Sequence, residues 1–411
     1  MMRRGPWKEV PLQSAFWFQE GPGVRTWQFQ SEGVKLLNVA NIEKSGTLNL
    51  SKTHRCLDAN EVAKKYSHFL VQAGDFVIAS SGISFDDDGL LRTRGAFVEE
   101  HHLPLCLNTS TIRFKATDGV SSLRFFRHWL DTVEFRSQVS KLVTGTSQQN
   151  FGPTHLKNIR ISMPSVDEQQ RLAEVLDRAE ALRTKRRAAL AQLDALVQSI
   201  FLDLFGDPAT NSKKWPMSTV GELANVQGGL QVSHARSKLP VQVPYLRVGN
   251  VYRNVLDLRE VKLMHVTQAE AERTKLAKDD LLIVEGHGNP DEIGRSCLWD
   301  GSIEPCVHQN HLIRARFAAE RVDPLYGSYF LNSQGGRKHL LKAGRTTTGL
   351  NTISVADVRE TPIAVPPSDL QRDFARRIAA VEKLKSTMRT SLAELDALFA
   401  SLQHRAFRGE L

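Results

Sequence analysis

Two stretches of the sequence are nearly the same: LAQLDALVQSI at residues 190–200 and LAELDALFASL at residues 392–402. The likeness continues without a gap when residues 156–205 are laid over residues 358–407, at a constant offset of 202. Sixteen of those 50 positions are identical. Internal similarity at a long, fixed offset indicates a duplicated structural unit.

Each copy begins with a short extended stretch that ends in proline, NIRISMP in the first and ETPIAVPP in the second. Pro164 and Pro366 disfavour helix in the residue before them, and Asp167 and Asp369 stand where the first turn of a helix favours an acid. Apolar residues then recur at alternating steps of three and four, which is typical of the seam of a coiled coil. The predicted seam includes Leu172, Leu176, Leu182, Leu193 and Ile200 in the first copy, and Phe374, Ile378, Leu384, Leu395 and Leu402 in the second.

The order of the segments along the chain constrains how two such helices can pair. The first helix leaves one globular region and leads into another, and the second helix leaves that other region. Full-length pairing therefore requires an antiparallel intramolecular coiled coil of about 58 Å, with a globular region at each end and a pseudo-twofold axis between them. Such a pair is either a ruler whose length matters, or simply a brace or half of an interface with another protein.

The two globular regions also resemble each other, more faintly. KLLNVANI at 35–42 is similar to PYLRVGNV at 244–251, and GDFVIAS at 74–80 is similar to DDLLIVE at 279–285. Short β-branched runs bounded by Gly, Asn and Asp predict buried strands. The fold class predicted is therefore two mixed α/β (α+β) domains, separated by two long helices.

Helices are predicted within the globular regions at residues 121–139 and 323–343. The predicted division of the chain is a first recognition domain at 1–164, a first spacer helix at 165–206, a second recognition domain at 207–366 and a second spacer helix at 367–411.

Composition narrows the class of protein. The 411 residues carry a formal net charge of +9, which permits nucleic-acid binding but also fits plain solubility. The four cysteines form no CxxC pair, which favours a reduced, cytoplasmic setting. No uninterrupted apolar run reaches the ~18 residues of a membrane helix, and no apolar core follows the basic N-terminus as a signal peptide would require.

Two segments carry a resemblance to a known family. LDALVQSIFLDLFGDPATNSKKWPMSTVGEL at 193–223 resembles the central junction of type I restriction-modification specificity (S) subunits, and the tail at 363–411 resembles their C-terminal region. The resemblance implies a chain that reads a split, asymmetric sequence of double-stranded DNA, with one target recognition domain per half. It also implies docking of two methyltransferase subunits and assembly with endonuclease/translocase subunits. S-adenosylmethionine and ATP with Mg²⁺ would then lie on those partners, and this chain would bind no cofactor.

Signatures of catalysis were sought and do not match. GRTTTG at 344–349 begins like a P-loop, but Leu350 stands where the phosphate-binding lysine is required. Asn289-Pro290 lacks the aromatic residue that amino-methyltransferases place after it, and no GxGxxG opens a βα unit. Asp257, Glu260 and Lys262 echo a nuclease set, but their spacing is cramped. No catalytic residues are therefore predicted.

Cys306, His308 and His311 have the residue types of a metal site. In a strand, Cys306 and His308 would share a face and His311 would not, and no fourth ligand is evident. We therefore expect burial or base contact and no metal.

DNA readout needs hydrogen-bonding side chains on polar loops. Candidates in the first domain are Ser80, Ser81, Arg92, Arg94, Gln148, Gln149 and Asn150. Candidates in the second domain are Glu285, His287, Asn289, Arg295, Arg345, Thr346, Thr347 and Thr348. Each of these also has an ordinary explanation as part of a solvated turn. Phe201 and Phe205, outside the seam, are candidate contacts for the methyltransferase subunits.

Two other classes of protein stay open from the sequence. One is a catalytic DNA enzyme, such as a nuclease with duplicated lobes, and the other is a coiled-coil adaptor that never touches DNA. Activity of the purified chain would favour the first, and absence of salt-sensitive DNA binding in the presence of methyltransferase partners would favour the second.

Overall fold

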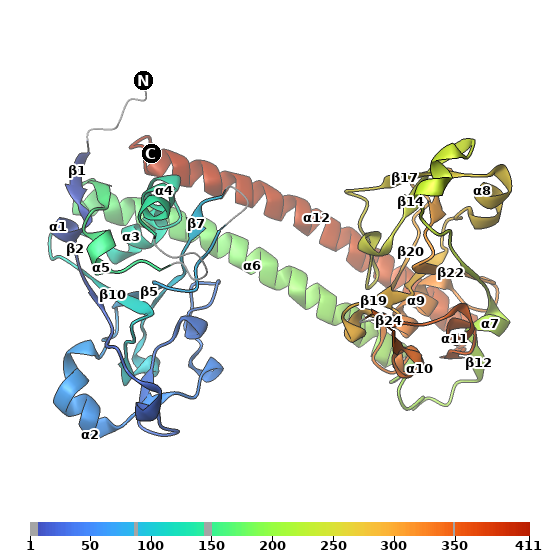
Figure 1. Ribbon diagram of the computed structural model, residues 1–411, viewed down its shortest axis with the longest axis horizontal. Helices are drawn as coiled ribbons and strands as arrows, with labels where there is room; N and C mark the ends of the chain where they lie inside the picture. The colour runs from blue at the N-terminus through green and yellow to red at the C-terminus, as the bar shows by residue number, and fades with distance from the viewer. Residues whose placement is uncertain (1–6, 86–88, 144–149, 348–349) are drawn as a thin grey trace. The chain divides into compact units, whose positions relative to one another are not determined.

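A computed structural model describes residues 7–85, 89–143, 150–347 and 350–411. The chain divides into two compact units, the first formed by Met1–Arg187 with Thr390–Leu411 and the second by Ala188–Arg389. Two long helices, α6 (Val166–Phe205) and α12 (Ser368–Ala406), each contribute to both units (Figure 1). The fold class predicted from the sequence, two sheet-rich domains linked by long helices, is thus confirmed.

The first unit holds three main sheets and a group of short helices. Its strands are β1 (Lys8–Pro11), β2 (Phe16–Glu20), β3 (Val34–Leu36), β4 (Cys56–Leu57), β5 (Phe76–Ala79), β6 (Ser84–Phe85), β7 (Leu91–Arg92), β8 (Gly95–Phe97), β9 (Leu105–Cys106), β10 (Thr111–Ala116) and β11 (Arg160–Met163). Its short helices are α1 (Leu12–Ala15), α2 (Ala59–Glu61), α3 (Leu123–Trp129), α4 (Val133–Leu142) and α5 (Pro153–Leu156).

The second unit has a similar inventory. Its strands are β12 (Met217–Thr219), β13 (Ala224–Gly228), β14 (Val241–Leu246), β15 (Val251–Tyr252), β16 (Val255–Leu256), β17 (Lys262–Val266), β18 (Leu281–Val284), β19 (Gly286–His287), β20 (Ser296–Leu298), β21 (Val307–His308), β22 (Leu312–Phe317), β23 (Arg345–Thr347), β24 (Leu350–Thr352) and β25 (Pro362–Ala364). Its short helices are α7 (Val220–Leu223), α8 (Gln268–Thr274), α9 (Pro324–Asn332), α10 (Lys338–Ala343) and α11 (Val355–Arg359).

The two units share one topology, as the faint sequence likeness predicted. The antiparallel sheet β2-β10-β5-β8 corresponds to β13-β22-β18-β20, and the mixed sheet β4-β3-β9 corresponds to β17-β14-β21. The two-stranded sheet β1-β11 corresponds to β12-β25. In the second unit, β19-β24-β23 form a further three-stranded sheet.

A buried asparagine repeats at the same place in both units. Asn41 accepts a hydrogen bond from the backbone N–H of Asn38 and donates to the carbonyl of Asn49. Asn250 accepts from the backbone N–H of Arg247 and donates to the carbonyl of Asp257. The matched motifs KLLNVANI and PYLRVGNV therefore build the same turn after β3 and after β14.

Each long helix ends inside a domain core. In the first unit, Leu172, Ala173 and Leu176 of α6 are fully buried in the cluster that also contains Phe125 and Ala406. The ring of Phe407, just after α12, lies 5.0 Å from that of Phe125. The helix ends are therefore part of the hydrophobic core and not merely attached to it.

The second unit buries the opposite ends of the same helices. Phe374 of α12 contacts Phe201 and Phe205 of α6, with ring centroids 5.6 and 5.4 Å apart, and Tyr326 of α9 packs on the same cluster. Phe201 and Phe205 are each 4% exposed. Their assignment as exposed contacts for methyltransferase subunits is wrong, because α9 and α12 cover them.

The predicted seam residues differ in how far they are buried. Leu172, Leu176, Phe374 and Ile378 are buried, and Leu193, Ile200, Leu395 and Leu402 are half-buried. Leu182 and Leu384 are 54% and 45% exposed, so they do not form the seam. An α-helix has about 3.6 residues per turn, so the face that carries a strict 3.5-residue repeat slowly rotates away from the partner helix. The residues that follow Leu182 and Leu384 then face the partner helix instead.

The residues that follow Leu182 and Leu384 are Arg183 and Lys385, which are both basic. Each forms an ion pair with a residue of the other long helix. In the first unit, Nε of Arg183 lies 2.5 Å from Oδ1 of Asp396, and the guanidinium stacks on the ring of Phe399. In the second unit, Nζ of Lys385 lies 2.8 Å from Oδ1 of Asp194. In both units later residues of α6 meet earlier residues of α12, so the predicted antiparallel pairing is confirmed within each unit.

The two helices predicted inside the globular regions are each broken in two. Residues 121–139 contain α3 and the start of α4, because Thr132 caps α4 by accepting the N–H of Phe135. Residues 323–343 contain α9 and α10, separated by Gly335 and Gly336. A Cβ on Gly335 would lie 2.1 Å from the backbone nitrogen of Ala209, so the chain passes too closely there for any other residue.

One glutamine repeats at the start of each long helix and ties that helix to its domain. Gln169 donates to the carbonyls of Pro164 and Val120 and accepts the N–H of Ser122. Gln371 donates to the carbonyls of Pro366 and Arg321 and accepts the N–H of Asp323. Both side chains are fully buried, so their partners have no water to replace them.

Gln169→Ala or Gln371→Ala should each lower the free energy of unfolding by about 2–3 kcal/mol, because the change leaves buried backbone groups without partners. The measurement is urea unfolding followed by circular dichroism. Gln170→Ala is the matched control, since Gln170 is exposed on the same turn of α6, and its effect should stay within about 0.5 kcal/mol. Equal stability of Gln169→Ala and Gln170→Ala would contradict the role assigned to Gln169.

Candidate nucleic-acid interface

In both units, three segments meet at the end of the central strand of the four-stranded sheet. In the first unit the N–H of Ser80 donates to the carbonyl of Ser110, and the N–H of Phe151 donates to the carbonyl of Ser80. In the second unit Glu285, His311 and Ile353 make the same two hydrogen bonds. We call these places the β5 junction (Ser80, Ser110, Phe151) and the β18 junction (Glu285, His311, Ile353).

A glycine lets the turn before β10 or β22 approach each junction. A Cβ on Gly21 would lie 2.4 Å from the backbone nitrogen of Asn108, and one on Gly229 would lie 2.2 Å from the carbonyl oxygen of Gln309. The turns Asn108–Ser110 and Gln309–His311 are therefore pressed against the ends of β2 and β13. This packing fixes the position of their polar side chains.

The predicted residues near the β5 junction differ in what they can contact. Ser80 is 1% exposed, so its side chain is structural and its assignment to DNA contact is wrong. Ser81 is half-buried and Asn150 is exposed, so both can reach a ligand. Gln148 and Gln149 lie outside the described residues.

Arg92 and Arg94 line a polar cavity of about 180 Å³ in the first unit. Arg92 is exposed on β7, and Arg94 is half-buried with its carbonyl bonded to the N–H of Ala79. Glu43, Arg127 and Glu180 line the same cavity. These two arginines therefore lie close to the β5 junction along the sheet, on a surface of mixed charge.

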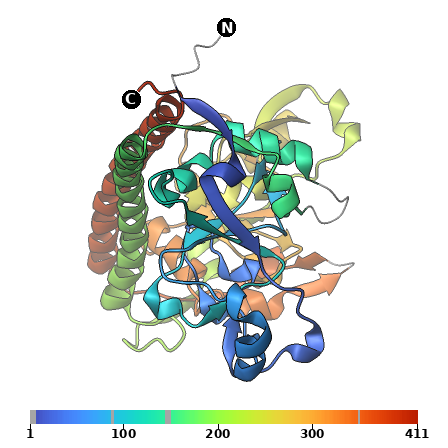
Figure 2. The same ribbon diagram turned by 90° about the vertical axis from the view of Figure 1, so that its left-hand side faces the viewer.

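The second unit gathers more of its predicted residues in one place. His287 of β19 pairs with Asn351 of β24, which also pairs with Thr346 of β23. The hairpin of β23 and β24, in orange, projects from the second unit in Figure 2. His287 and the backbone of Arg345, Thr346 and Thr347 thus belong to one small sheet, and Glu285 directly precedes its strand β19, whereas Thr348 lies outside the described residues.

Two other predicted residues have structural partners. The side chain of Asn289 accepts the N–H of Asp291 and caps a short turn, although the residue stays exposed. Arg295 is 6% exposed; it pairs with Glu292 at 2.7 Å, donates to the carbonyl of Val248 and stacks on Tyr252. The assignment of Arg295 to base contact is therefore wrong, because its guanidinium is buried and bonded within the protein.

Sequence reasoning missed the polar turns before β10 and β22 as parts of the interface. Thr109 is exposed beside the β5 junction, and His311 is exposed beside the β18 junction. Nδ1 of His311 lies 3.2 Å from Oε2 of Glu285, whose pKa is raised by burial. The signal was available, since NTS and QNH occupy matching positions before the two strands, but His311 was interpreted together with Cys306 and His308 and not as part of this turn.

The residues of the possible metal site are separated, as expected. Cys306 and His308 are buried, and burial lowers the pKa of His308 to about 4. His311 is exposed. The three therefore do not converge on a common point.

Among the described residues, one group could hold a metal ion by proximity, His128, Asp177 and Glu180. Nε2 of His128 lies 2.7 Å from Oδ1 of Asp177, while Arg124 pairs with Asp177 and Arg127 pairs with Glu180. The carboxylates are thus already neutralised by guanidinium groups, and the cluster is an ion-pair network that joins α3 to α6. Partial burial would raise the pKa of Asp177, but hydrogen bonds from His128 and Arg124 outweigh it and lower the pKa to about 2.

Helix α6 also contains an 18-residue window that meets the length and composition of a membrane span. Val197, Phe201 and Phe205 near its end are buried in the core of the second unit. The buried share of the window is 17%.

Comparison with known proteins identifies the class. Residues 29–192 match the family described as "Type I restriction modification DNA specificity domain". The specificity subunit of the type I restriction enzyme EcoKI from Escherichia coli (strain K12) is 27% identical over 308 residues, which cover 70% of this chain and 65% of the relative. The StySPI specificity subunit from Salmonella potsdam is 25% identical over 309 residues, covering 71% and 66%.

A solved structure has the same fold. The S subunit of a type I restriction-modification system from M. genitalium matches with a TM-score of 0.56 at 15% identity, over 99% of this chain and 98% of that chain. The alignments with EcoKI and StySPI span just under two thirds of those relatives' own length.

Residues 29–192 therefore carry a type I DNA specificity domain. The resemblance to type I restriction-modification specificity subunits that the sequence predicted is confirmed by the family match over residues 29–192 and by these two relatives. Both relatives are named specificity subunits.

Asp177→Asn should lower the free energy of unfolding of the first unit by about 1–2 kcal/mol at pH 7. The folded-state pKa of about 2 lies below the ordinary value of 3.8, so this stabilisation is present above about pH 4 and is lost as the pH falls through 2. Thermal melting from pH 7 to pH 2 measures it, with the exposed Asp118→Asn as control. A difference between Asp177→Asn and wild type that stays constant down to pH 2 would rule out this linkage.

Proposed function

We propose that this chain is the DNA-reading subunit of a type I restriction-modification complex, in which each unit reads one half of a two-part, asymmetric site. The observation that carries the proposal is the pair of junctions. The same backbone scheme holds Ser80 and Glu285, yet the surrounding polar side chains differ between the units. A shared scaffold with different polar groups suits two readers with different target bases.

The paired helices set the gap between the two halves in this proposal. Four ends of two helices are built into two hydrophobic cores, and the helices run antiparallel within each unit. A helix cannot shift along its axis without pulling core residues such as Leu176 or Phe374 from their cluster. The number of residues between the two cores therefore fixes how far apart the readers are held.

The remaining partners follow from the family. Two methyltransferase subunits dock on this chain and supply S-adenosylmethionine chemistry, and endonuclease/translocase subunits supply ATP hydrolysis with Mg²⁺. The complex is cytoplasmic, where its DNA substrate lies. No cofactor is assigned to this chain.

The nuclease alternative is weakened by the partners of its proposed residues. Asp257 is held by Arg259, whose guanidinium and backbone N–H donate to it and lower its pKa to about 2. Glu260 pairs with Arg247 and lies 3.6 Å from Nζ of Lys262. Each of these carboxylates is therefore already paired with an arginine. The adaptor alternative predicts that the assembled complex does not bind DNA in a salt-sensitive way.

Inserting four residues after Ala188 and four after Thr390 should change the gap between the half-sites and leave the half-site sequences unchanged. Each insertion adds about one helical turn, or about 6 Å, between the two cores. Mapping methylated adenines in cells that carry the variant with its methyltransferase partner measures the result. Insertion of four residues in the loop between Lys213 and Lys214, outside the helices, is the control. Altered half-sites with an unchanged gap would refute the ruler.

Two arginines predicted as base contacts should behave differently. Arg345→Ala, at the start of the projecting hairpin, should cost roughly 1–3 kcal/mol in binding to the cognate duplex and relax discrimination at one base position. Arg295→Ala should instead lower the melting temperature, because it removes a buried ion pair with Glu292, and should leave discrimination unchanged. Competition gel shifts with single-base variants of the site, made with the methyltransferase-bound complex, separate the two. Unchanged affinity and discrimination in Arg345→Ala would remove that residue from the interface.

A further inference from the structure

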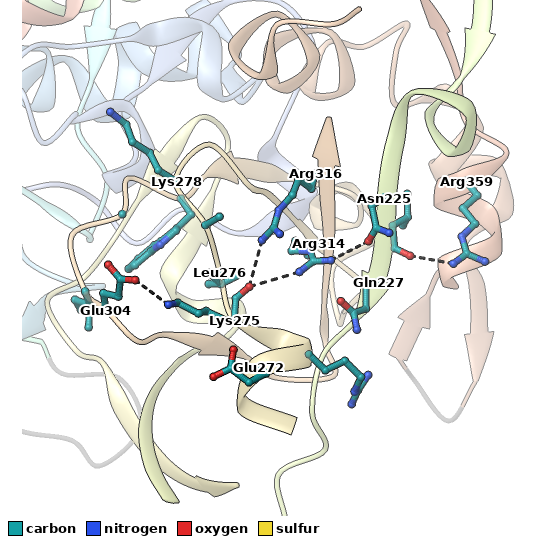
Figure 3. A pocket seen from close by; sticks show the side chains of 16 residues that line it. Asn225, Gln227, Glu272, Lys275, Leu276, Lys278, Glu304, Arg314, Arg316 and Arg359 are labelled. Carbon is teal, nitrogen blue, oxygen red and sulfur yellow. Dashed lines mark hydrogen bonds and ion pairs between the residues drawn. The ribbon is translucent and has the colours of Figure 1, made fainter. Parts of the chain in front are cut away.

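A large polar groove lies on the second unit, away from the hydrophobic face of its four-stranded sheet. It has a volume of about 1000 Å³ and lies between the outward side chains of β13 and β22 and the segment 272–278 (Figure 3). Val226 and Ala315 point to the opposite side of the sheet, into the core. The alternation of side chains along a strand therefore places Asn225, Gln227, Arg314 and Arg316 in the groove.

The floor of the groove is held rigidly. Arg314 is 5% exposed, and its guanidinium donates to Oδ1 of Asn225 at 2.9 Å and to the carbonyl of Lys275 at 3.5 Å. Its buried Nε has no hydrogen-bond partner among the described residues. Arg316 forms two hydrogen bonds with the carboxylate of Asp280, at 2.6 and 2.7 Å. Both cations therefore have fixed positions before any ligand arrives.

The rim of the groove contains basic side chains that have no ion-pair partner among the described residues. Six basic side chains line the groove, against two carboxylates, Glu272 and Glu304. Lys275 is paired with Glu304 at 2.8 Å, and Arg359 donates to the carbonyl of Val226. Arg273 and Lys278 are exposed, and within the described residues neither has an ion pair. The groove thus combines an excess of positive charge with two cations free to meet an anion.

The first unit places two cations at the corresponding positions of its strand β10. Arg113 of β10 is 4% exposed, donates to the side chain of Gln19 and to the carbonyl of Leu70, and has a buried Nε without a partner among the described residues. Asp75 lies 3.5 Å from Arg113 and 3.7 Å from Lys115. Arg113 and Lys115 therefore correspond to Arg314 and Arg316.

We propose that the β13–β22 groove binds phosphodiester groups of the DNA backbone beside the half-site that the second unit reads. The proposal rests on the proposed function, since it needs this chain to lie on DNA. Base-reading groups must differ between two readers of different sequences, whereas the backbone is the same in both halves. A pair of cations that both units hold at corresponding positions suits the common element, and phosphate contacts set register without carrying sequence information.

The test uses the full complex with its methyltransferase partner and two fluorescent duplexes, one cognate and one scrambled. The variant is Arg273→Gln with Lys278→Gln, and the matched control is Lys214→Gln with Arg259→Gln, which removes two exposed charges of the second unit outside the groove. Binding is measured by anisotropy from low to high salt. All four side chains are exposed, so neither variant should change the melting temperature. An unchanged melting temperature therefore shows that the variant is folded.

The groove variant should bind both duplexes roughly tenfold more weakly at about 0.1 M salt, with the slope of log K against log salt reduced by about 1 to 2. The ratio of cognate to scrambled affinity should stay unchanged, and the control should match wild type. Unchanged slope and affinity in the groove variant would overturn the proposal. So would loss of co-purifying methyltransferase with an unchanged slope, which would assign the groove to a protein partner. Failure of the wild-type complex to prefer the cognate duplex would refute the proposed function itself.

Discussion

Burial of the four ends of α6 and α12 is the constraint on which the rest of the structure depends. Leu172 and Leu176 enter the core of the first unit, and Phe205 and Phe374 enter that of the second. Neither globular region closes its core without these side chains. A helix that exposed such a stripe alone would also be unstable in water. Helix pairing and domain folding are therefore one event in each unit, and Gln169 and Gln371 add the hydrogen bonds that orient helix and domain.

The sequence predicts this architecture well because its main signals are periodic and repeated. The long helices follow from the offset of 202 and the heptad spacing, and their antiparallel pairing follows from the order of segments along the chain. The shared topology of the two domains follows from the fainter likeness of the two globular regions. The interior of the seam was less predictable. Leu182 and Leu384 fit the heptad pattern, yet Arg183 and Lys385 face the partner helix, because Asp396 and Asp194 neutralise them there. The hydrophobic pattern of one helix contains no information about an acidic residue on the other helix. Such an acidic partner is what allows a basic residue to face the interior of the helix pair.

Single site residues were the least predictable, for a related reason. Ser80 and Arg295 have the chemistry of base-reading groups, but burial decides what they do. Burial depends on segments distant in sequence, such as Phe151 against Ser80 and Glu292 with Tyr252 around Arg295. The overlooked turn at His311 shows that matching position is a better guide than residue type alone.

The duplication also separates what must stay the same from what is free to change. Asn41 and Asn250, Gln169 and Gln371, and Arg113 and Arg314 each make matching hydrogen bonds to backbone or amide groups. Such contacts hold the scaffold, and they tolerate little variation because a buried polar group without its partner costs free energy. The side chains around the junctions make few such contacts, so they can diverge without unfolding either unit. Divergence at Asn150 and at the β19-β24-β23 sheet is what the proposed reading of different bases by the two units requires.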